Sequence, residues 1–344
     1  MHFASDNWTG AHPAILDALS QANDAIEPAY GGDTFTNAAI EKIRSVFECD
    51  ADVFFVATGG AANGLALSCL TPPWGTILCH QDSHIEMDEC AGPEFFTGGA
   101  RLMPLAGEHG KLTPNIIETA LNSYPERVPH GSPAHAISLT HLSESGTAYT
   151  LREIKALCDS AKARNLRIHM DGARFANALI HTGATPAEMS WKAGIDVLCL
   201  GATKNGAMAA EAVLFFDKAL AKEFAHRRKR AGHLLSKQRF ISAQFLAWLD
   251  QDRWLEWARH ANQMASQLSQ ALCTLDGVSL AWPAQGNEVF AIMPPALAER
   301  LRGGGAQFYP WITPGDVSSG NTWRLICSWK TSPDDIDALI KLAR

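Results

Sequence analysis

Between residues 50 and 220, short apolar runs alternate with stretches of helical pattern. The expected strands are 53–56, 76–79, 136–139, 166–170, 197–200 and 212–216, and the expected helices between them are 61–70, 84–91 and 151–163. Short strands that are apolar throughout and are separated by helices are typical of a parallel sheet covered on both faces. The sequence therefore predicts an α/β fold with a mostly parallel sheet.

After about residue 220 the pattern changes. Long helical stretches at 219–231 and 240–275 are followed by short strands at 278–281, 289–292 and 323–327 and by a closing helix at 333–342. The chain has 344 residues, whereas a single hydrophobic core stops growing near ~250–300 residues. We therefore expect an N-terminal arm at 1–13, a large domain at 14–240 and a smaller C-terminal α+β domain at 241–344.

Charge and composition exclude several classes of protein. The net charge of −7 gives no long-range attraction for nucleic acid or an anionic membrane. The basic run 227–230 is interpreted as a solvated helix face, with an anion site or subunit contact as the alternative. The sequence contains no stretch of 18 apolar residues, so it predicts no membrane span. Residues 1–6 do not resemble a secretory signal. The eight cysteines are scattered singly, which favours a reducing cytoplasm and predicts neither a disulfide framework nor a metal site.

A strand that ends on an acidic residue is the first candidate for chemistry. Asp171 closes the predicted strand, and Gly172 permits an abrupt turn after it. In open parallel sheets, ligands gather at the carboxyl ends of the strands, where an acid can pair with a cationic ring nitrogen. Arg174 offers a planar fork suited to a carboxylate. The alternative is a helix-capping aspartate followed by a surface arginine.

A lysine follows the next strand. Lys204 is flanked by small residues, a setting that suits a Schiff-base lysine. A surface-loop lysine is the alternative. The spacing favours the chemical interpretation, because one helix and one return strand fit between Asp171 and Lys204. Both side chains are then expected at the same edge of the sheet, facing one crevice.

Two further motifs follow strands that should end at this edge. Gly59 and Gly60 precede a predicted helix, whose N–H groups and dipole suit a phosphate monoester. His84 could stack on a flat ring or transfer protons. Ordinary turn glycines and a capping histidine are the alternatives. Together, a phosphate cradle, a stacking ring, an acid for a pyridine nitrogen and a lysine for an aldehyde are the contacts that pyridoxal 5'-phosphate (PLP) requires.

Five segments of the sequence resemble the L-threonine aldolases, which belong to the aspartate-aminotransferase-like (fold type I) PLP enzymes. The segments are Ser5-Asp6-Asn7, the Tyr-Gly-Gly-Asp run with Thr at 30–36, the Thr-Gly phosphate loop at 58–63, the His84 to Glu89 segment and His169-Met170-Asp171-Gly172-Ala173-Arg174. The resemblance is strongest over residues 5–216. It implies the same fold, a PLP domain followed by a smaller domain.

For the cofactor phosphate, the resemblance implies five contacts. Gly59, Gly60 and Ala61 would bind it through backbone N–H groups, and Thr203 would add a hydroxyl. Lys237 would reach the phosphate of a neighbouring subunit, because members of the family are usually tetramers built as dimers of dimers. We expect a homotetramer for the same reason.

For the ring and the substrate, the resemblance implies further roles. His84 would stack on the ring, Asp171 would bind the ring nitrogen and Lys204 would form the Schiff base. The substrate carboxylate would be bound by a second group of residues, which comprises Ser5, Arg174 and Arg324.

The sequence departs from the family at one functional segment. Common members read Glu-Asn-Thr-His-Asn-Gly, whereas this chain reads His141-Leu142-Ser143-Glu144-Ser145-Gly146. The family histidine that could act as a base is therefore Glu144 here. We leave His84, Glu89 and Glu144 open as the group that removes the β-hydroxyl proton, since that choice requires hydrogen-bond geometry.

The implied activity is aldol cleavage of L-threonine, L-allo-threonine or a related β-hydroxy-α-amino acid, phenylserine included, to glycine and an aldehyde. Another PLP reaction, above all β-elimination on a small amino acid, is the nearest alternative. A nucleotide-binding dehydrogenase would require a Gly-rich fingerprint that is missing near the start of the sequence. A non-catalytic scaffold is disfavoured because both Asp171 and Lys204 are present.

Overall fold

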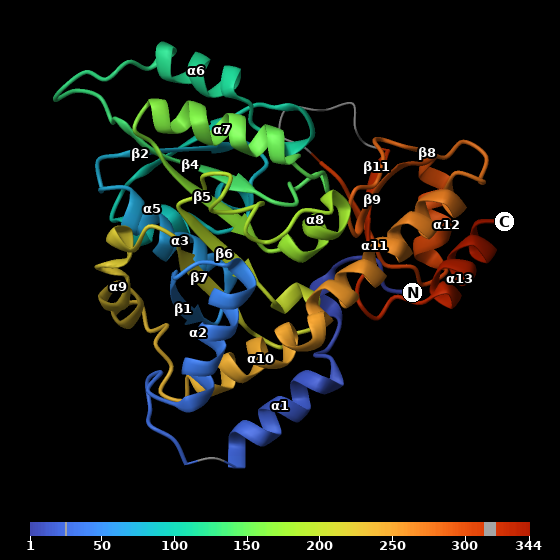
Figure 1. Cartoon of the computed structure of the whole chain (residues 1–344). Coiled ribbons are helices and arrows are strands. Elements are labelled where there is room, and N and C mark those ends of the chain that lie inside the picture. The colour runs from blue at the N-terminus through green and yellow to red at the C-terminus, as the bar shows by residue number, and fades with distance from the viewer. Residues whose placement is uncertain (25, 313–320) are drawn as a thin grey trace.

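A seven-stranded sheet lies at the centre of the larger part of the molecule (Figure 1). The computed structural model describes residues 1–24, 26–312 and 321–344. The strand order is β1-β7-β6-β5-β4-β2-β3. The strands are β1 (Asp52–Val56), β2 (Thr76–His80), β3 (Arg101–Leu105), β4 (Ala134–Thr140), β5 (Arg167–Gly172), β6 (Val197–Gly201) and β7 (Glu211–Phe215).

The sheet is mostly parallel, as the sequence predicted. Only β7 is reversed, pairing antiparallel with both β1 and β6. Strands β5 and β6 are parallel neighbours, with Asp171 paired to Cys199. The reversal has a functional consequence, because the first residue of β7, Glu211, lies at the edge where the parallel strands end. The edge strand β3 was not predicted, since Pro104 interrupts its apolar pattern.

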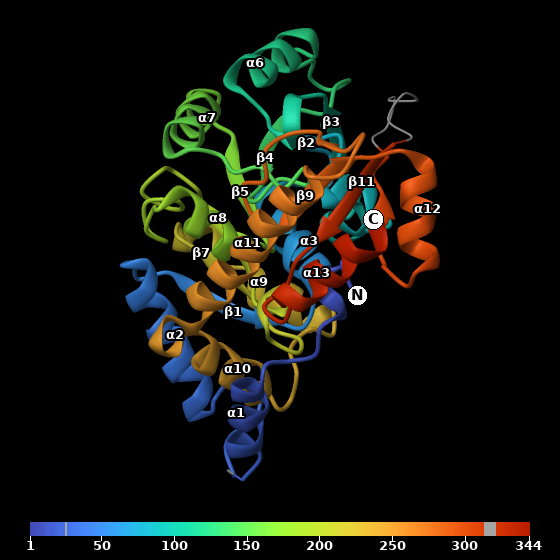
Figure 2. The ribbon, with the colours of Figure 1, turned by 90° about the vertical axis from the view of Figure 1, so that its right-hand side faces the viewer.

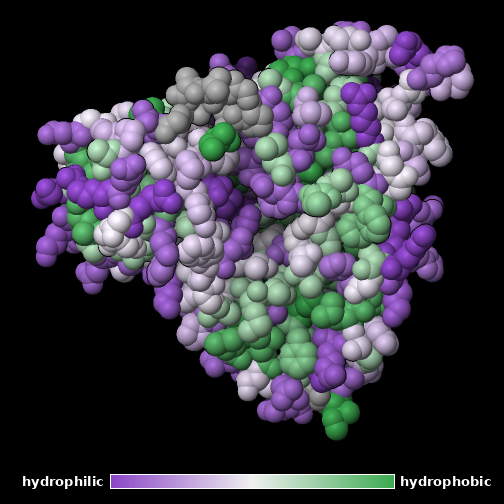
Figure 3. Space-filling model, turned by 180° about the vertical axis from the view of Figure 1, so that it is seen from behind, coloured by the Kyte–Doolittle hydropathy of each residue, from purple (hydrophilic) through white to green (hydrophobic). Residues whose placement is uncertain are grey.

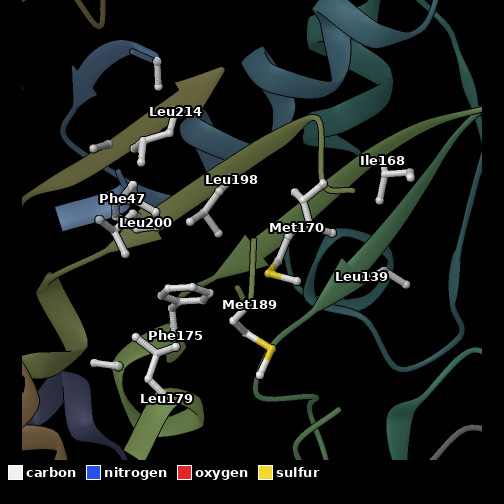
Figure 4. Packing of buried hydrophobic residues seen from close by; sticks show 14 of the residues in the cluster. Phe47, Leu139, Ile168, Met170, Phe175, Leu179, Met189, Leu198, Leu200 and Leu214 are labelled. Carbon is white, nitrogen blue, oxygen red and sulfur yellow. The ribbon is translucent and has the colours of Figure 1, made fainter. Parts of the chain in front are cut away.

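Helices cover both faces of the sheet, as expected for an α/β fold. Figure 4 shows one face, where Phe175 and Leu179 of α8 and Phe47 of α2 pack against Leu198 and Leu200 of β6. On the opposite face, α3 packs against the sheet and α5 packs on α3. The helices of this part are α1 (Pro13–Asp24), α2 (Thr34–Phe47), α3 (Gly59–Leu70), α4 (His84–Met87), α5 (Gly92–Thr97), α6 (Pro114–Ser123), α7 (Leu151–Ala163), α8 (Phe175–Thr182), α9 (Phe224–Arg230) and α10 (Arg239–Leu249).

A second core surrounds a four-stranded antiparallel sheet of order β10-β11-β9-β8. Its elements are β8 (Ser279–Leu280), β9 (Glu288–Ile292), β10 (Tyr309–Pro310), β11 (Thr322–Ile326), α12 (Pro295–Gly303) and α13 (Pro333–Ala343). The long helix α11 (Arg253–Leu272) joins the two parts: Trp254 and Trp257 belong to the large core, whereas Met264 and Leu268 belong to the small one. Helix α10 packs with the large core, and the boundary at residue 240 stays a prediction.

Local sequence signals explain where several helices begin and end. Helix α7 has the predicted bounds, and Thr150 and Glu153 close a capping box at its start. The predicted helix 84–91 ends after one turn, at Met87, because Cys90 and Ala91 have left-handed backbone angles. The predicted stretch 240–275 is two helices, separated by left-handed residues at 251 and 252. The stretch 219–231 likewise divides into a short 3-10 turn and α9.

The N-terminal segment is bound into the small part of the molecule. The Phe3 side chain is fully buried in the small core. Its N–H donates to the carbonyl of Gln307 (2.9 Å), and its carbonyl accepts from the N–H of Ile326 (2.8 Å). Figure 2 shows both chain ends beside α13. Residues from the two ends of the chain therefore lie side by side.

None of the helices among the described residues has both the length and the apolar composition that a membrane crossing requires.

Candidate active site

A cavity of about 260 Å³ opens at the edge of the large sheet where the parallel strands end. Thr140, Asp171 and Gly201, the final residues or near-final residues of β4, β5 and β6, contribute to its walls. Further lining residues come from the start of α3, from the segments after β2, β4 and β5, from the turn after β6 and from the start of β7; they include Gly59, Gly60, Asn63, His84, Glu144, Arg174, Thr203, Lys204 and Glu211. The structure therefore brings together eight of the site residues predicted from the sequence: Gly59, Gly60, His84, Glu144, Asp171, Arg174, Thr203 and Lys204.

Asp171 is a buried acid that is held ionised. Its Oδ1 accepts from the N–H of Ala173 (2.9 Å), and its Oδ2 accepts from the amide of Asn63 (2.8 Å). Burial raises the pKa of Asp171, but the charges of His84 and Lys204 and the two hydrogen bonds outweigh burial, so the pKa lies below its ordinary value. An ionised acid at this position is what a protonated ring nitrogen needs.

Lys204 lies in the 3-10 turn Thr203–Asn205 that follows β6. The turn passes close to the segment after β5, because a Cβ on Gly201 would stand 2.9 Å from the Cα of Ala173. Only glycine permits this approach. It brings the strand end before Lys204 against the strand end that bears Asp171, and both side chains line the cavity.

The N-terminus of α3 forms another wall. Thr58 caps the helix, its hydroxyl accepting from the N–H of Ala61 (3.3 Å). No atom lies within 4 Å of the position that a Cβ on Gly59 would take, so the first turn is open to an anion. Gly59 and Gly60 line the cavity, whereas Ala61 does not. The free N–H groups of this helix start suit a phosphate.

His84 starts α4 and is fixed by two acids. Its ring Nδ1 lies 2.8 Å from Glu89 Oε1, and its backbone N–H donates to Glu144 Oε1 (3.1 Å). The hydrogen bond with Glu89 is the largest influence on the ring and raises the pKa of His84 above its ordinary value, against the opposing effect of burial. The Glu89 side chain is only 3% exposed and does not line the cavity.

Two buried carboxyl groups in the cavity wall have raised pKa values. Burial raises the pKa of Glu144 to about 7, and the charge of Lys204 opposes this effect. Burial likewise raises the pKa of Glu211 to about 7. The Thr203 hydroxyl donates to Glu211 and accepts from the N–H of Ala210. The Thr203 hydroxyl proton is thus already bonded, and its predicted contact to a phosphate stays a prediction.

Arg174 is buried and bound by acids from distant parts of the chain. Its Nε and Nη2 donate to the two oxygens of Asp6 at 2.8 and 3.1 Å, and Nη2 lies 3.5 Å from Glu288 Oε1. Burial lowers the pKa of Arg174, but the charges of Asp6 and Glu288 raise it by more than burial lowers it. The guanidinium is therefore a permanent cation. A cation in the cavity wall can bind a carboxylate.

Besides Ala61 and Glu89, three predicted residues lie outside the cavity lining: Ser5, Arg324 and Lys237. The Ser5 hydroxyl caps the first 3-10 turn by accepting from the N–H of Asn7 (3.1 Å), and Ser5 lines a different cavity. Arg324 lies over the Trp311 ring at 5.3 Å and lines a neighbouring cavity, which shares Glu144 with the main one. Lys237 is exposed. The roles that the sequence gave these residues stay predictions.

Sequence reasoning missed the polar residues that support the site. Asp6, Glu211 and Glu288 are buried at or behind its walls, and Asn63 and Asn7 line it. An acid inside an apolar strand is a signal for Glu211 and Glu288, since burying an unpaired carboxylate is costly. Nothing in the sequence pairs Asp6 with Arg174.

The residues present fit PLP. The wall contains a lysine for an aldehyde, an ionised acid for the ring nitrogen and an open helix N-terminus for a phosphate. These three groups come from separate elements, α3, β5 and the turn after β6. PLP requires all three together, whereas each alone would suit many ligands.

Known proteins resemble the chain over nearly its whole length. The model of the beta-eliminating lyase family matches residues 2–294. A low specificity L-threonine aldolase of Pseudomonas aeruginosa is 43% identical, covering 99% of this chain and 96% of the relative. A low specificity L-threonine aldolase of a Pseudomonas species is also 43% identical, over 96% and 93% of the two chains.

Solved structures agree with this relationship. A threonine aldolase structure from Leishmania major has a TM-score of 0.92 at 29% identity and covers 99% of this chain and 98% of its own. An aspartate aminotransferase structure from Rhizobium meliloti has a TM-score of 0.69 at 17% identity, over 98% and 88% of the two chains, and shows the shared fold alone. Because the family match and the relatives span most of the chain, this protein belongs to the beta-eliminating lyase family and is a PLP-dependent lyase related to the threonine aldolases.

Proposed function

We propose that the protein cleaves the Cα–Cβ bond of L-threonine, L-allo-threonine or a related β-hydroxy-α-amino acid, such as phenylserine, to glycine and an aldehyde. One observation carries the proposal: Lys204, Asp171 and the open start of α3 converge on one cavity in a chain that is 43% identical to low specificity L-threonine aldolases. When bound, PLP supplies an aldehyde for amine capture and a ring that accepts the electrons of the breaking bond.

Four residues prepare the cavity for the cofactor. Lys204 would hold the cofactor through its amine, at the aldehyde group. Asp171, ionised and bonded by Ala173 and Asn63, keeps a proton on the ring nitrogen. Gly59 leaves room for the phosphate at the helix start, and Gly60 lines the same wall.

Arg174 orients the substrate by binding its carboxylate. A fixed carboxylate sets the rotation about the N–Cα bond, and that rotation decides which bond at Cα stands perpendicular to the ring. Asp6 and Glu288 hold the guanidinium in place. Arg324 and Ser5 are the additional contacts expected from the sequence.

Glu144 is the group best suited to remove the β-hydroxyl proton. Of the three candidates, Glu89 is behind His84 and outside the cavity lining, and His84 Nδ1 is bonded to Glu89. Glu144 lines the cavity, and its pKa of about 7 matches the operating range of a general base. The proton from the hydroxyl goes to Glu144 as the aldehyde leaves, and a proton added at Cα completes glycine.

A panel of L-threonine, L-allo-threonine and phenylserine tests the proposal. Release of glycine and the matching aldehyde is the expected result. The match to a beta-eliminating lyase family favours β-elimination as the second candidate. That reaction would release ammonia and the matching 2-oxo acid, which is 2-oxobutyrate from threonine or allo-threonine and phenylpyruvate from phenylserine. If none of these amino acids yields either pair of products, both candidate functions are wrong.

The assembly that we propose is a homotetramer built as a dimer of dimers, working in the cytoplasm. Figure 3 supports a subunit contact, because hydrophobic residues gather on the lower back of the molecule, where Figure 1 places α1, α2 and α10. A groove of about 520 Å³ lies between these helices. In such an assembly, Lys237 would reach the phosphate site of a neighbour. Sedimentation velocity at micromolar concentration would contradict the assembly if it found a fully active monomer.

A further inference from the structure

One amide group, that of Asn63, lies between Asp171 in the cavity wall and Glu89 behind His84. Asn63 is on α3 and only 2% exposed. Its Nδ2 donates to Asp171 Oδ2 at 2.8 Å and to Glu89 Oε1 at 2.9 Å. Carboxylate oxygens only accept, so the amide must turn its NH₂ group toward both acids. The two N–H groups of one nitrogen are therefore fully used.

The second acid continues the chain of hydrogen bonds to His84. Glu89 Oε1 lies 2.8 Å from His84 Nδ1 and also accepts from Asn63. Asp171, Asn63, Glu89 and His84 thus form one continuous path. We name this path the Asn63 network, and it comes from three separate elements of the fold: α3, β5 and the loop around α4.

We infer that Asn63 is a positioning residue that keeps Asp171 and Glu89 as two separate carboxylates, so that Asp171 serves the ring nitrogen while Glu89 serves His84. This inference rests on the proposed function, in which Asp171 and His84 contact the cofactor. Asn63 would orient the two carboxyl groups relative to each other, which neither acid can do alone.

The physical reason is geometric. Each acid has one oxygen fixed by its own N–H of the Asn63 amide, at 2.8 Å for Asp171 and 2.9 Å for Glu89. A hydrogen bond to an ionised acceptor is short and directional, so the amide fixes the orientation of both carboxyl groups. The other groups whose charges act here are Lys204 and Glu144, which act on both Asp171 and His84, and Glu211 and His169, which face Asp171.

Asn63→Leu keeps the branched shape of the side chain and removes both N–H groups. Glu89 and Asp171 should then lose the contact that fixes their orientation, so Glu89 should pair less well with the His84 ring and Asp171 should present its charge less well to the ring nitrogen. We expect the pKa of the His84 ring to fall by about one unit and PLP to bind the apo-protein about tenfold more weakly. Asn63→Ser retains one donor and should give intermediate values.

Two measurements on the purified protein test this expectation. NMR titration of the apo-protein follows the His84 ring, whose signal is identified among the 13 histidines by its loss in His84→Asn. Quenching of tryptophan fluorescence on adding PLP gives the dissociation constant. Neither readout depends on turnover. A folded Asn63→Leu protein with an unchanged His84 titration and unchanged PLP affinity would overturn the inference.

Asn177→Leu is the matched control. Asn177 is also a buried helical amide, but it donates to Asn262 of α11 and does not line the cavity. Its substitution should lower stability without moving the His84 titration. Should Asn63→Leu fail to fold, Asn63→Ser decides the question by the same two readouts. If the wild-type protein cleaves threonine but Asn63→Leu leaves the His84 titration unchanged, this inference alone is wrong. If Asn63→Leu shifts the His84 titration but the wild-type protein cleaves no β-hydroxy-α-amino acid, the proposed function alone is wrong.

Discussion

Arg174 and Asp6 form a two-pronged ion pair between residues 168 positions apart in the chain, with Nε–Oδ2 and Nη2–Oδ1 distances of 2.8 and 3.1 Å. Both side chains are almost fully buried, at 8% and 1% exposure. Asn287 also donates to Asp6 Oδ2 (3.0 Å). The pair therefore connects the N-terminal segment, the end of β5 and the small sheet at the cavity wall.

Removing Asp6 should destabilise the protein and weaken substrate binding. Asp6→Ala leaves the buried Arg174 charge poorly compensated, which typically costs ~3–5 kcal/mol. KM for the amino acid should rise as the guanidinium loses its fixed orientation. Urea denaturation and steady-state kinetics measure the two effects. The control Asp159→Ala removes an exposed i,i+4 ion pair with Lys155 and should change stability by less than ~0.5 kcal/mol. Equal effects of the two substitutions would contradict the structural role of Asp6.

Glu144 should set the acid limb of the pH profile. A base must be deprotonated, and burial raises the pKa of Glu144 to about 7. kcat/KM should therefore fall about tenfold per pH unit below pH 7 and level off above it. Glu144→Gln should lower the rate by ~10²–10⁴-fold and remove this limb. Nearby Glu86 is exposed and outside the cavity lining, so Glu86→Gln serves as the control. A Glu144→Gln enzyme with the native profile would exclude Glu144 as the base.

Lys204 should carry the cofactor covalently. Lys204→Ala should lose turnover by at least ~10²–10⁴-fold and lose the visible absorbance of lysine-bound PLP. Borohydride reduction followed by peptide mass mapping would locate the attached cofactor at Lys204 in the wild type. The exposed Lys222 provides a control by substitution to alanine. Attachment at any other lysine would end the assignment.

Stability of the apo-protein should fall as pH rises from about 4.5 to 7, in part because of Glu211. Its folded-state pKa is raised from 4.5 to about 7 by burial. Between these values the folded protein retains a proton that the unfolded chain has released, so unfolding becomes easier with rising pH. The loss is on the order of 3 kcal/mol at most. Glu211→Gln should flatten this part of the curve in thermal scans, and an unchanged slope would contradict the raised pKa.

The central sheet and the reactive groups could be predicted from sequence because their signals are local. Strand β5 reads as a buried strand ending in Asp171, and β6 leads directly to Lys204. Parallel neighbours must end at the same edge, which brings the two side chains together. The resemblance to threonine aldolases added the residues that no local pattern singles out, such as Glu144.

The supporting contacts could not be predicted, because they depend on tertiary structure. Asp6 meets Arg174 only because the N-terminal segment packs against the small core, and Asn63 meets Glu89 only through the packing of α3. The antiparallel direction of β7 could not be predicted either, because the apolar pattern of a buried strand does not depend on the direction of the strand. The early end of α4 is a backbone effect at Cys90 and Ala91, two residues with no strong turn preference.

The hydrogen bonds of Phe3 with Gln307 and Ile326 impose an order on biosynthesis. On the ribosome, residues 3–6 are translated some 320 residues before the strand that receives them. At roughly 5–20 residues per second, this leaves the N-terminal segment without its binding partner for tens of seconds. A nascent chain can therefore form the central sheet before β11 binds the N-terminal segment. The wall at which Asp6 orients Arg174 is completed only after β11 has been translated.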